Sequence, residues 1–184
     1  QGLNLLIATG RDMENAIKAL RTLKITNDTV LTNGAILANL NSREYSIVRI
    51  INKEISEDIL KIADELGLAP IVYAAYDEPN HIVTFKKGKW NPKGMEPLSI
   101  KDYSHLFEQE TISIQFCDNY AKTHKMYEVL DKKYRNKINL IEIQDVILGD
   151  YYWLEINSPL AGKEKMIETF LEMHGITWEN VIAF

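Results

Sequence analysis

Three short polar stretches carry groups that can hold an anion, and the first is Thr9-Gly10-Arg11. It directly follows the apolar run "LLIA" and precedes a helical pattern. A hydroxyl and backbone amides at the start of a helix can bind a phosphate group. Ligands of open parallel sheets bind at the carboxyl ends of strands, so this stretch is a candidate phosphate site. The alternative is that Thr9 only caps the helix beside a convenient glycine.

The other two stretches are Asn33-Gly34 and Lys163. Asn33-Gly34 ends the next apolar segment, so it is expected at the same sheet edge as Thr9. Its alternative role is a tight turn. Lys163 starts a helix after "NSPLAG", where a cation opposes the helix dipole unless an anion is bound. Its alternative role is an ordinary surface lysine.

The remaining reactive residue types show no catalytic or metal-binding pattern. The four histidines lack ligand spacing, and Cys117 is expected as a small buried residue. Dinucleotide, P-loop, serine-hydrolase and zinc-protease motifs are absent from these 184 residues. Four aromatic residues are expected in the core or at its rim, with a pocket lining as the alternative: Tyr73, Tyr76, Phe85 and Trp90.

Composition limits the class of protein. With 184 residues and 46% apolar content, the chain can form one large domain or two small ones. The net charge of −5 argues against a nucleic-acid-binding surface. A single cysteine favours a reducing compartment, the cytoplasm. No apolar run approaches the roughly 18 residues that indicate a membrane span, so no membrane partner is expected.

The elements that would position these residues follow from periodicity. An apolar strand over 3–8, a helix over 12–23 and a short strand over 29–37, broken by the turn signal Asn33-Gly34, form a βαβ unit, which predicts a parallel sheet. A mostly antiparallel α+β segment follows, beginning with a hairpin over 36–50 and a helix over 56–66 capped by Ser56. The end returns to the first pattern, with a helix over 163–174 and an apolar strand over 181–184.

The order of "LLIATGR", "LTNGAIL" and "LEINSPLAGKEKMIETFLEMHGITWENVIAF" resembles the haloacid dehalogenase superfamily, specifically Cof-type phosphatases with a large cap. The resemblance covers the whole chain. It implies a Rossmann-like parallel α/β core, incomplete here, with an inserted α+β cap of mostly antiparallel sheet. The implied boundaries are 1–37 for the first part of the core, 38–153 for the cap and 154–184 for the second part of the core.

The resemblance also implies roles for individual residues. Thr9 and Lys163 match catalytic positions, a hydroxyl that binds a phosphoryl oxygen and a lysine that offsets charge. Gly10 and Arg11 complete the phosphate-binding "TGR", and Asn33-Gly34 matches a substrate-binding "NGA". The implied activity is magnesium-dependent hydrolysis of small phosphorylated metabolites through an aspartyl phosphate, with substrate selected by cap loops such as 86–95.

The chain departs from the family pattern at both ends. The DxD motif expected upstream of Thr9 and the GDxxND motif expected after "VIAF" are absent, so the nucleophile and the magnesium ligands are missing from it. We therefore expect an internal piece of a longer enzyme that is inactive by itself. The alternative is a non-catalytic or degenerate module that binds a phosphorylated ligand. The oligomeric state is left open.

Overall fold

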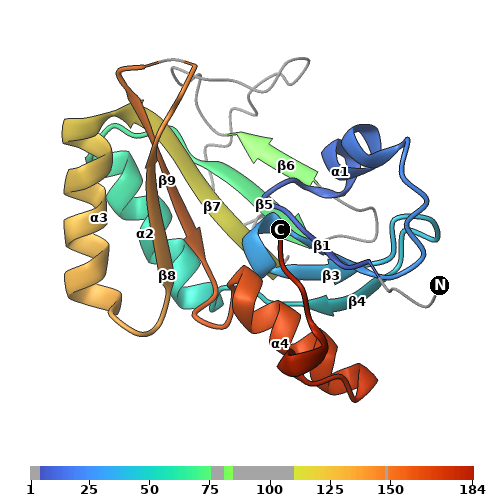
Figure 1. The fold of residues 1–184 in the computed structure, drawn as a ribbon. Coiled ribbons are helices and arrows are strands. Elements are labelled where there is room, and N and C mark those ends of the chain that lie inside the picture. Colours follow the sequence, from blue (N-terminus) through green and yellow to red (C-terminus); the bar gives the residue numbers. More distant parts are fainter. Residues whose placement is uncertain (1–4, 76–80, 85–109, 148) are drawn as a thin grey trace. The chain divides into compact units, whose positions relative to one another are not determined.

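The computed structural model describes residues 5–75, 81–84, 110–147 and 149–184. The chain divides into two compact units (Figure 1). Unit 1 consists of Gln1–Arg49 and Leu160–Phe184, and unit 2 consists of Ile50–Pro159. The compact units thus change at 49/50 and 159/160, whereas the expected domain boundaries are 37/38 and 153/154. The mixed fold, one sheet with a parallel pair and one antiparallel sheet, confirms the predicted fold class.

Unit 1 begins with the predicted βαβ unit. Strand β1 (Ile7–Ala8) pairs in parallel with β2 (Thr29–Leu31), and helix α1 (Met13–Leu20) connects them. The helix buries Met13 and Ala16, which follow the apolar periodicity of the sequence.

The segment predicted as a strand broken at Asn33-Gly34 is broken there, but the break also reverses the chain. After β2, the 3₁₀ turn η1 (Thr32–Gly34) leads into β3 (Ile36–Ala38), which pairs antiparallel with β2. Strand β4 (Tyr45–Val48) then pairs antiparallel with β3, completing the order β1-β2-β3-β4. The hairpin expected at the start of the inserted segment therefore extends the sheet of unit 1.

Helix α4 (Lys163–His174) covers this sheet and forms its core with it. Its residues Met166, Phe170 and Leu171 are buried and pack with Val30 and Leu37. The helix has the predicted bounds and ends at Gly175, whose φ of 64° is a left-handed conformation that glycine adopts easily. The short 3₁₀ turn η3 (Trp178–Asn180) follows.

The predicted strand over 181–184 is wrong. Val181 has extended backbone angles, but these four residues form no strand, and Ile182 and Phe184 are exposed. A strand exists only through hydrogen bonds to a neighbouring strand, and none of the described strands pairs with this segment. The apolar composition of residues 181–184 therefore predicted a strand that lacks a partner among the described strands.

Unit 2 is an antiparallel sheet covered by two helices, α2 (Lys53–Glu65) and α3 (Tyr120–Tyr134). The strand order is β6-β5-β7-β9-β8. Both helices pack on β7 (Figure 1). The strands are β5 (Ile71–Ala75), β6 (His81–Thr84), β7 (Glu110–Asn119), β8 (Asn139–Gln144) and β9 (Tyr151–Asn157).

Helix α2 starts three residues earlier than predicted, which corrects the role given to Ser56. Asn52 is the cap, and its Oδ1 accepts hydrogen bonds from the amides of Glu54 (2.9 Å) and Ile55 (3.3 Å). Ser56 is instead buried within the helix. Both residue types cap helices well, so the sequence alone did not distinguish them.

Some sequence interpretations fall outside the described residues. They concern Tyr76, Phe85, Trp90 and His105, and the substrate-selecting loop over 86–95. Over the ranges that are described, no helix is both long enough and apolar enough to cross a membrane.

Candidate phosphate-binding site

Thr9 and Asn33 meet at the carboxyl ends of the parallel strands β1 and β2. The amide of Thr9 donates to the carbonyl of Val30 (2.8 Å), which extends the pairing one residue past β1. The amide of Asn33 then donates to the carbonyl of Thr9 (3.2 Å), and the amide of Thr32 donates to the carbonyl of Arg11 (3.0 Å). The backbone at 9–11 and the backbone at 32–33 are therefore fastened to each other.

The hydroxyl of Thr9 is oriented by its own loop. Its Oγ1 accepts a hydrogen bond from the amide of Arg11 (3.2 Å). A hydroxyl that accepts one hydrogen bond still has a proton to donate. The side chain of Thr9 is half-buried, while Gly10 and Arg11 are exposed. The loop thus carries a hydroxyl donor at Thr9 and, two residues later, an exposed arginine.

The turn after β2 has an unusual backbone. Thr32, Asn33 and Gly34 have consecutive positive φ values of 47°, 50° and 91°. A positive φ is uncommon outside glycine and is a marked outlier for a β-branched residue such as Thr32. Strained backbone of this kind often occurs at functional sites. Here it turns the chain back while keeping Asn33 against Gly10, since a Cβ on Gly10 would lie 2.9 Å from Asn33 Oδ1.

Gly34 brings the start of α4 to this turn. A Cβ at position 34 would lie 2.2 Å from the carbonyl carbon and oxygen of Gly162. Gly162 is the N-cap residue of α4, and Lys163 is the first residue of the helix. The N-cap makes no side-chain hydrogen bond. The positive end of the helix dipole and the exposed Lys163 therefore lie next to the turn that contacts Thr9.

The start of α1 is capped by Asp12, which corrects the alternative role of Thr9 as the cap. The carboxylate of Asp12 is buried and accepts from the amide of Asn15 (2.8 Å) and from its Nδ2 (2.7 Å). A carboxylate already occupies the amino end of this helix. An anion at this edge would therefore meet the 9–11 loop and the start of α4, while the end of α1 carries its own negative group.

The structure thus brings together the sequence-predicted residues of unit 1. Thr9, Gly10 and Asn33 share one set of backbone and packing contacts, and Gly34 joins them to the residue before Lys163. Arg11 lies in the same loop, with its side chain at the surface. The phosphate-binding, catalytic and substrate-binding roles assigned to these residues remain predictions.

The described residues do not fit a magnesium site. In the ranges that the structure covers, no group of three or more His, Cys, Asp or Glu side chains is arranged to hold a metal ion. Magnesium prefers carboxylate oxygens, and neither a hydroxyl nor a lysine ammonium replaces them. The predicted magnesium therefore has no ligand set among these residues.

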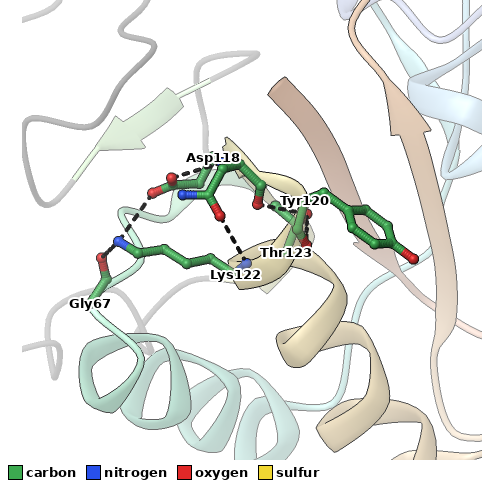
Figure 2. A network of polar contacts seen from close by, with 6 residues as sticks. Gly67, Asp118, Tyr120, Lys122 and Thr123 are labelled. Atoms are coloured by element: carbon green, nitrogen blue, oxygen red, sulfur yellow. Dashed lines mark hydrogen bonds and ion pairs between the residues drawn. The ribbon is translucent and has the colours of Figure 1, made fainter. Parts of the chain in front are cut away.

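Unit 2 contains a separate polar network where β7 meets α3 (Figure 2). Asp118 is buried, and its Oδ1 accepts from the amide of Asn119 (2.8 Å), the N-cap of α3. Lys122 Nζ lies 3.5 Å from Asp118 Oδ2 and 3.4 Å from the carbonyl of Gly67. Lys122 ties the start of α3 to Gly67 at the end of α2, and Asp118 and Asn119 hold the junction of β7 with α3, so these contacts are structural.

Cys117 and His124 show what the sequence resolved and what it missed. Cys117 is buried, as predicted, and burial together with the charges of Asp145 and Asp118 raises the pKa of its thiol to about 11. His124 on α3 contacts Glu142 on β8, with Nδ1 and Oε2 3.0 Å apart. Spacing along the sequence gives no signal for this pair, because its members lie on different elements.

Three further residues at the candidate site carried little sequence signal. Asp12 is recognisable as a capping type at a helix start. Gly162 precedes a predicted helix, but its contact with Gly34 is not local in sequence. Arg49 lies in an ordinary strand pattern, yet its guanidinium hydrogen-bonds to residues that flank Lys163. A single sequence holds no pattern that marks such a long-range contact.

Solved structures share this fold. A haloacid dehalogenase-like hydrolase from B. subtilis matches with a TM-score of 0.74 and 16% identity, covering 97% of this chain and 70% of its own. A haloacid dehalogenase-like hydrolase from Bacteroides thetaiotaomicron matches with a TM-score of 0.70 and 20% identity. The match covers 100% of this chain and 68% of the other chain. A phosphatase of the HAD enzyme superfamily from the same organism matches with a TM-score of 0.71 and 14% identity. The match covers 96% of this chain and 61% of the other chain.

These identities support the fold alone, and the chain spans only part of each solved protein's length. No curated protein matches the sequence. The family profile described as haloacid dehalogenase-like hydrolase matches residues 1–184, which is the whole chain. The chain therefore belongs to the haloacid dehalogenase-like hydrolase family.

Proposed function

We propose that these residues belong to a cytoplasmic, magnesium-dependent phosphatase that hydrolyses phosphoric monoesters of small phosphorylated metabolites. The observation that carries the proposal is the contact of Gly34 with Gly162. That contact joins the start of α4, with Lys163, to the turn hydrogen-bonded to Thr9. A hydroxyl donor, a lysine and a helix N-terminus at one sheet edge suit a phosphoryl group.

Each residue has a distinct physical task in this proposal. The Thr9 hydroxyl donates to a non-bridging phosphoryl oxygen, because its acceptor side is already used by the Arg11 amide. Lys163 and the dipole of α4 offset the negative charge that such oxygens carry. Arg11 adds an exposed cation that attracts anionic substrates. Asn33 and Gly34 shape the edge through their left-handed backbone.

The nucleophile of the proposed reaction lies outside these residues. An aspartate that forms a covalent phosphoryl intermediate splits one difficult displacement into two easier steps. Magnesium, held by carboxylates elsewhere in the protein, would supply charge stabilisation. Thr9 and Lys163 orient and neutralise but cannot replace the attacking carboxylate, so we expect no turnover from the 184-residue chain alone.

The test is phosphate release by the full-length protein with magnesium across a panel of phosphorylated metabolites. Lys163→Ala should lower kcat/KM at least 100-fold. Lys18→Ala, which removes an exposed lysine on α1, should leave kcat/KM within twofold. Phosphate release that is insensitive to Lys163→Ala, or absent with every substrate, would contradict the proposal.

A second candidate is a non-catalytic module that binds a phosphorylated ligand. The observation that favours it is the lack of a carboxylate metal site among the described residues. It predicts that the full-length protein binds inorganic phosphate through Thr9 and Lys163 but releases none from any substrate. Phosphate titration followed by ³¹P NMR, alongside the turnover assay, separates the two candidates.

A further inference from the structure

Arg49 connects the two segments of unit 1 at the point where the chain leaves it and returns. It is the last residue of the first segment, and Leu160 is the first residue of the second. The amide of Arg49 donates to the carbonyl of Ala35 (2.8 Å), which anchors it to the β3–β4 hairpin. Its Nη1 donates to the carbonyl of Leu160. One residue therefore fastens the returning segment to the sheet.

The same guanidinium reaches further into α4. Its Nη2 donates to Thr169 Oγ1 (2.7 Å) and lies 3.5 Å from the carbonyl of Lys165. Thr169 Oγ1 in turn donates to the carbonyl of Lys165 (2.8 Å). The contacts of Arg49 therefore lie on both sides of Lys163, three residues before it and two and six residues after it.

The chemistry of these contacts requires arginine. The planar guanidinium holds several donors in a fixed fork, whereas a lysine ammonium is a compact point charge on a flexible stem. The three acceptors, two carbonyls and a hydroxyl, are neutral. These acceptors carry no charge, so in this contact the side chain acts through its donor geometry.

We propose that Arg49 is a positioning residue for Lys163. It fixes the 160–162 segment and the first two turns of α4, so that Lys163 stays at the edge formed by Thr9 and Asn33. This inference rests on the proposed phosphate site. Small displacements of such groups are costly, because a shift of about 1 Å can lower a rate about 100-fold.

A purely structural role makes a different prediction. If Arg49 only anchored α4, Arg49→Lys would lower the melting temperature, and folded protein would keep its phosphate affinity. A positioning role predicts that the loss depends on Lys163. The double-mutant cycle between positions 49 and 163 measures this dependence directly.

The experiment uses the full-length protein with Arg49→Lys, Lys163→Ala and the double variant, and inorganic phosphate as the probe. Affinity is measured by ³¹P NMR titration below the melting temperature of each variant. Arg49→Lys should weaken phosphate binding at least fivefold in the Lys163 background and less than twofold in the Lys163→Ala background. Arg43→Lys is the matched control, since Arg43 lies between β3 and β4 on the same hairpin and pairs with Glu14 on α1; it should change affinity less than twofold.

Two results would overturn the inference: an Arg49→Lys affinity within twofold of wild type, or an equal loss with and without Lys163. Turnover measured in parallel separates this inference from the proposed function. If wild type binds phosphate without hydrolysing any substrate, the phosphatase proposal fails and the cycle still decides the role of Arg49. If wild type binds no phosphate and shows no turnover, both proposals fail.

Discussion

Gly34 lies against Gly162 so closely that a Cβ at position 34 would fall 2.2 Å from the carbonyl carbon of Gly162. The atoms in the way are backbone, which cannot rotate aside. Gly34 also has a φ of +91°. Gly34→Ala should therefore combine overpacking, typically about 1–3 kcal/mol, with a left-handed backbone penalty of about 1–2 kcal/mol. Urea unfolding should show a loss in the free energy of unfolding of about 2–5 kcal/mol, the sum of the two penalties.

The control for this prediction is Gly175→Ala, in the same unit. Gly175 also has a positive φ, of 64°, but a Cβ there would meet nothing within 4 Å. It should lose only the backbone term. An equal loss at both positions would mean that the packing of Gly34 on Gly162 adds nothing to stability.

Much of the fold was predictable because it depends on local patterns. The apolar spacing of Met166, Phe170 and Leu171 predicted α4 with its correct bounds, and these residues form the core of unit 1. Periodicity of this kind reflects burial of one face, which is a local property of the sequence.

The errors arose where partners distant in sequence decide the structure. Residues 181–184 are apolar but form no strand, because a strand requires a paired neighbour and none of the described strands pairs with them. The turn at 32–34 was expected to interrupt a strand, yet it reverses the chain through three left-handed residues. At the candidate site, residue types indicated Thr9, Asn33 and Lys163, whereas the contact of Arg49 with α4 depends on folding.

Asp12 should stabilise α1 through its side chain. Its carboxylate accepts from the amide and the side chain of Asn15 at 2.8 and 2.7 Å. Loss of a cap typically costs about 1 kcal/mol. Asp12→Ala should lower the free energy of unfolding by about that amount, and Asp12→Ser, which keeps an acceptor, should lower it less. Denaturant unfolding of both variants checks the order, and equal stabilities would contradict the capping role.

Asp58 should make unit 2 sensitive to acid. Burial alone would raise the pKa of this carboxyl, but hydrogen bonds from Lys133 and Tyr134, each 2.7 Å, outweigh it and hold the pKa below its ordinary value of 3.8. A lowered folded-state pKa gives stability that is present above pH 3.8 and is lost as the pH falls through the folded value. Asp58→Asn should therefore be less stable than wild type at about pH 7, and the gap should narrow at about pH 3.

Tyr134→Phe provides the matching test. It removes one of the two hydrogen bonds to Asp58 and leaves Lys133 in place. The folded-state pKa of Asp58 should rise toward 3.8, so the loss of stability should begin at a higher pH than in wild type. Urea midpoints measured at several pH values decide this, and identical pH profiles for the two proteins would refute the assignment.

Cys117 should be unreactive in the folded protein. Its thiol is buried, and a pKa of about 11 leaves about one thiolate in a thousand at pH 8. Modification by a disulfide reagent at pH 8 should be slower than that of a small free thiol by at least about 100-fold, and guanidinium should restore the rate. Rapid labelling under native conditions would show that the site opens or that the thiol is exposed.

Asn157 carries two buried side-chain atoms without a hydrogen-bond partner in unit 2. It is 1% exposed, and neither its Oδ1 nor its Nδ2 has a hydrogen-bond partner. It lies on β9 opposite Ser113 and Asn139, in the middle of three paired strands. An unsatisfied buried polar group costs about 1–3 kcal/mol, and an apolar group of similar shape removes that cost. Asn157→Leu should therefore raise the free energy of unfolding by about 1 kcal/mol.

Two further variants separate this cause from general changes in packing. Asn157→Asp keeps the shape but places a charge in the same buried position, so it should be less stable than wild type at about pH 7. Ser56→Ala removes a buried hydroxyl on α2 that also lacks a partner, and it should be neutral or slightly stabilising. Calorimetry of the three proteins gives the comparison. Destabilisation by Asn157→Leu of more than about 1 kcal/mol would contradict the prediction that replacing this amide removes a buried cost.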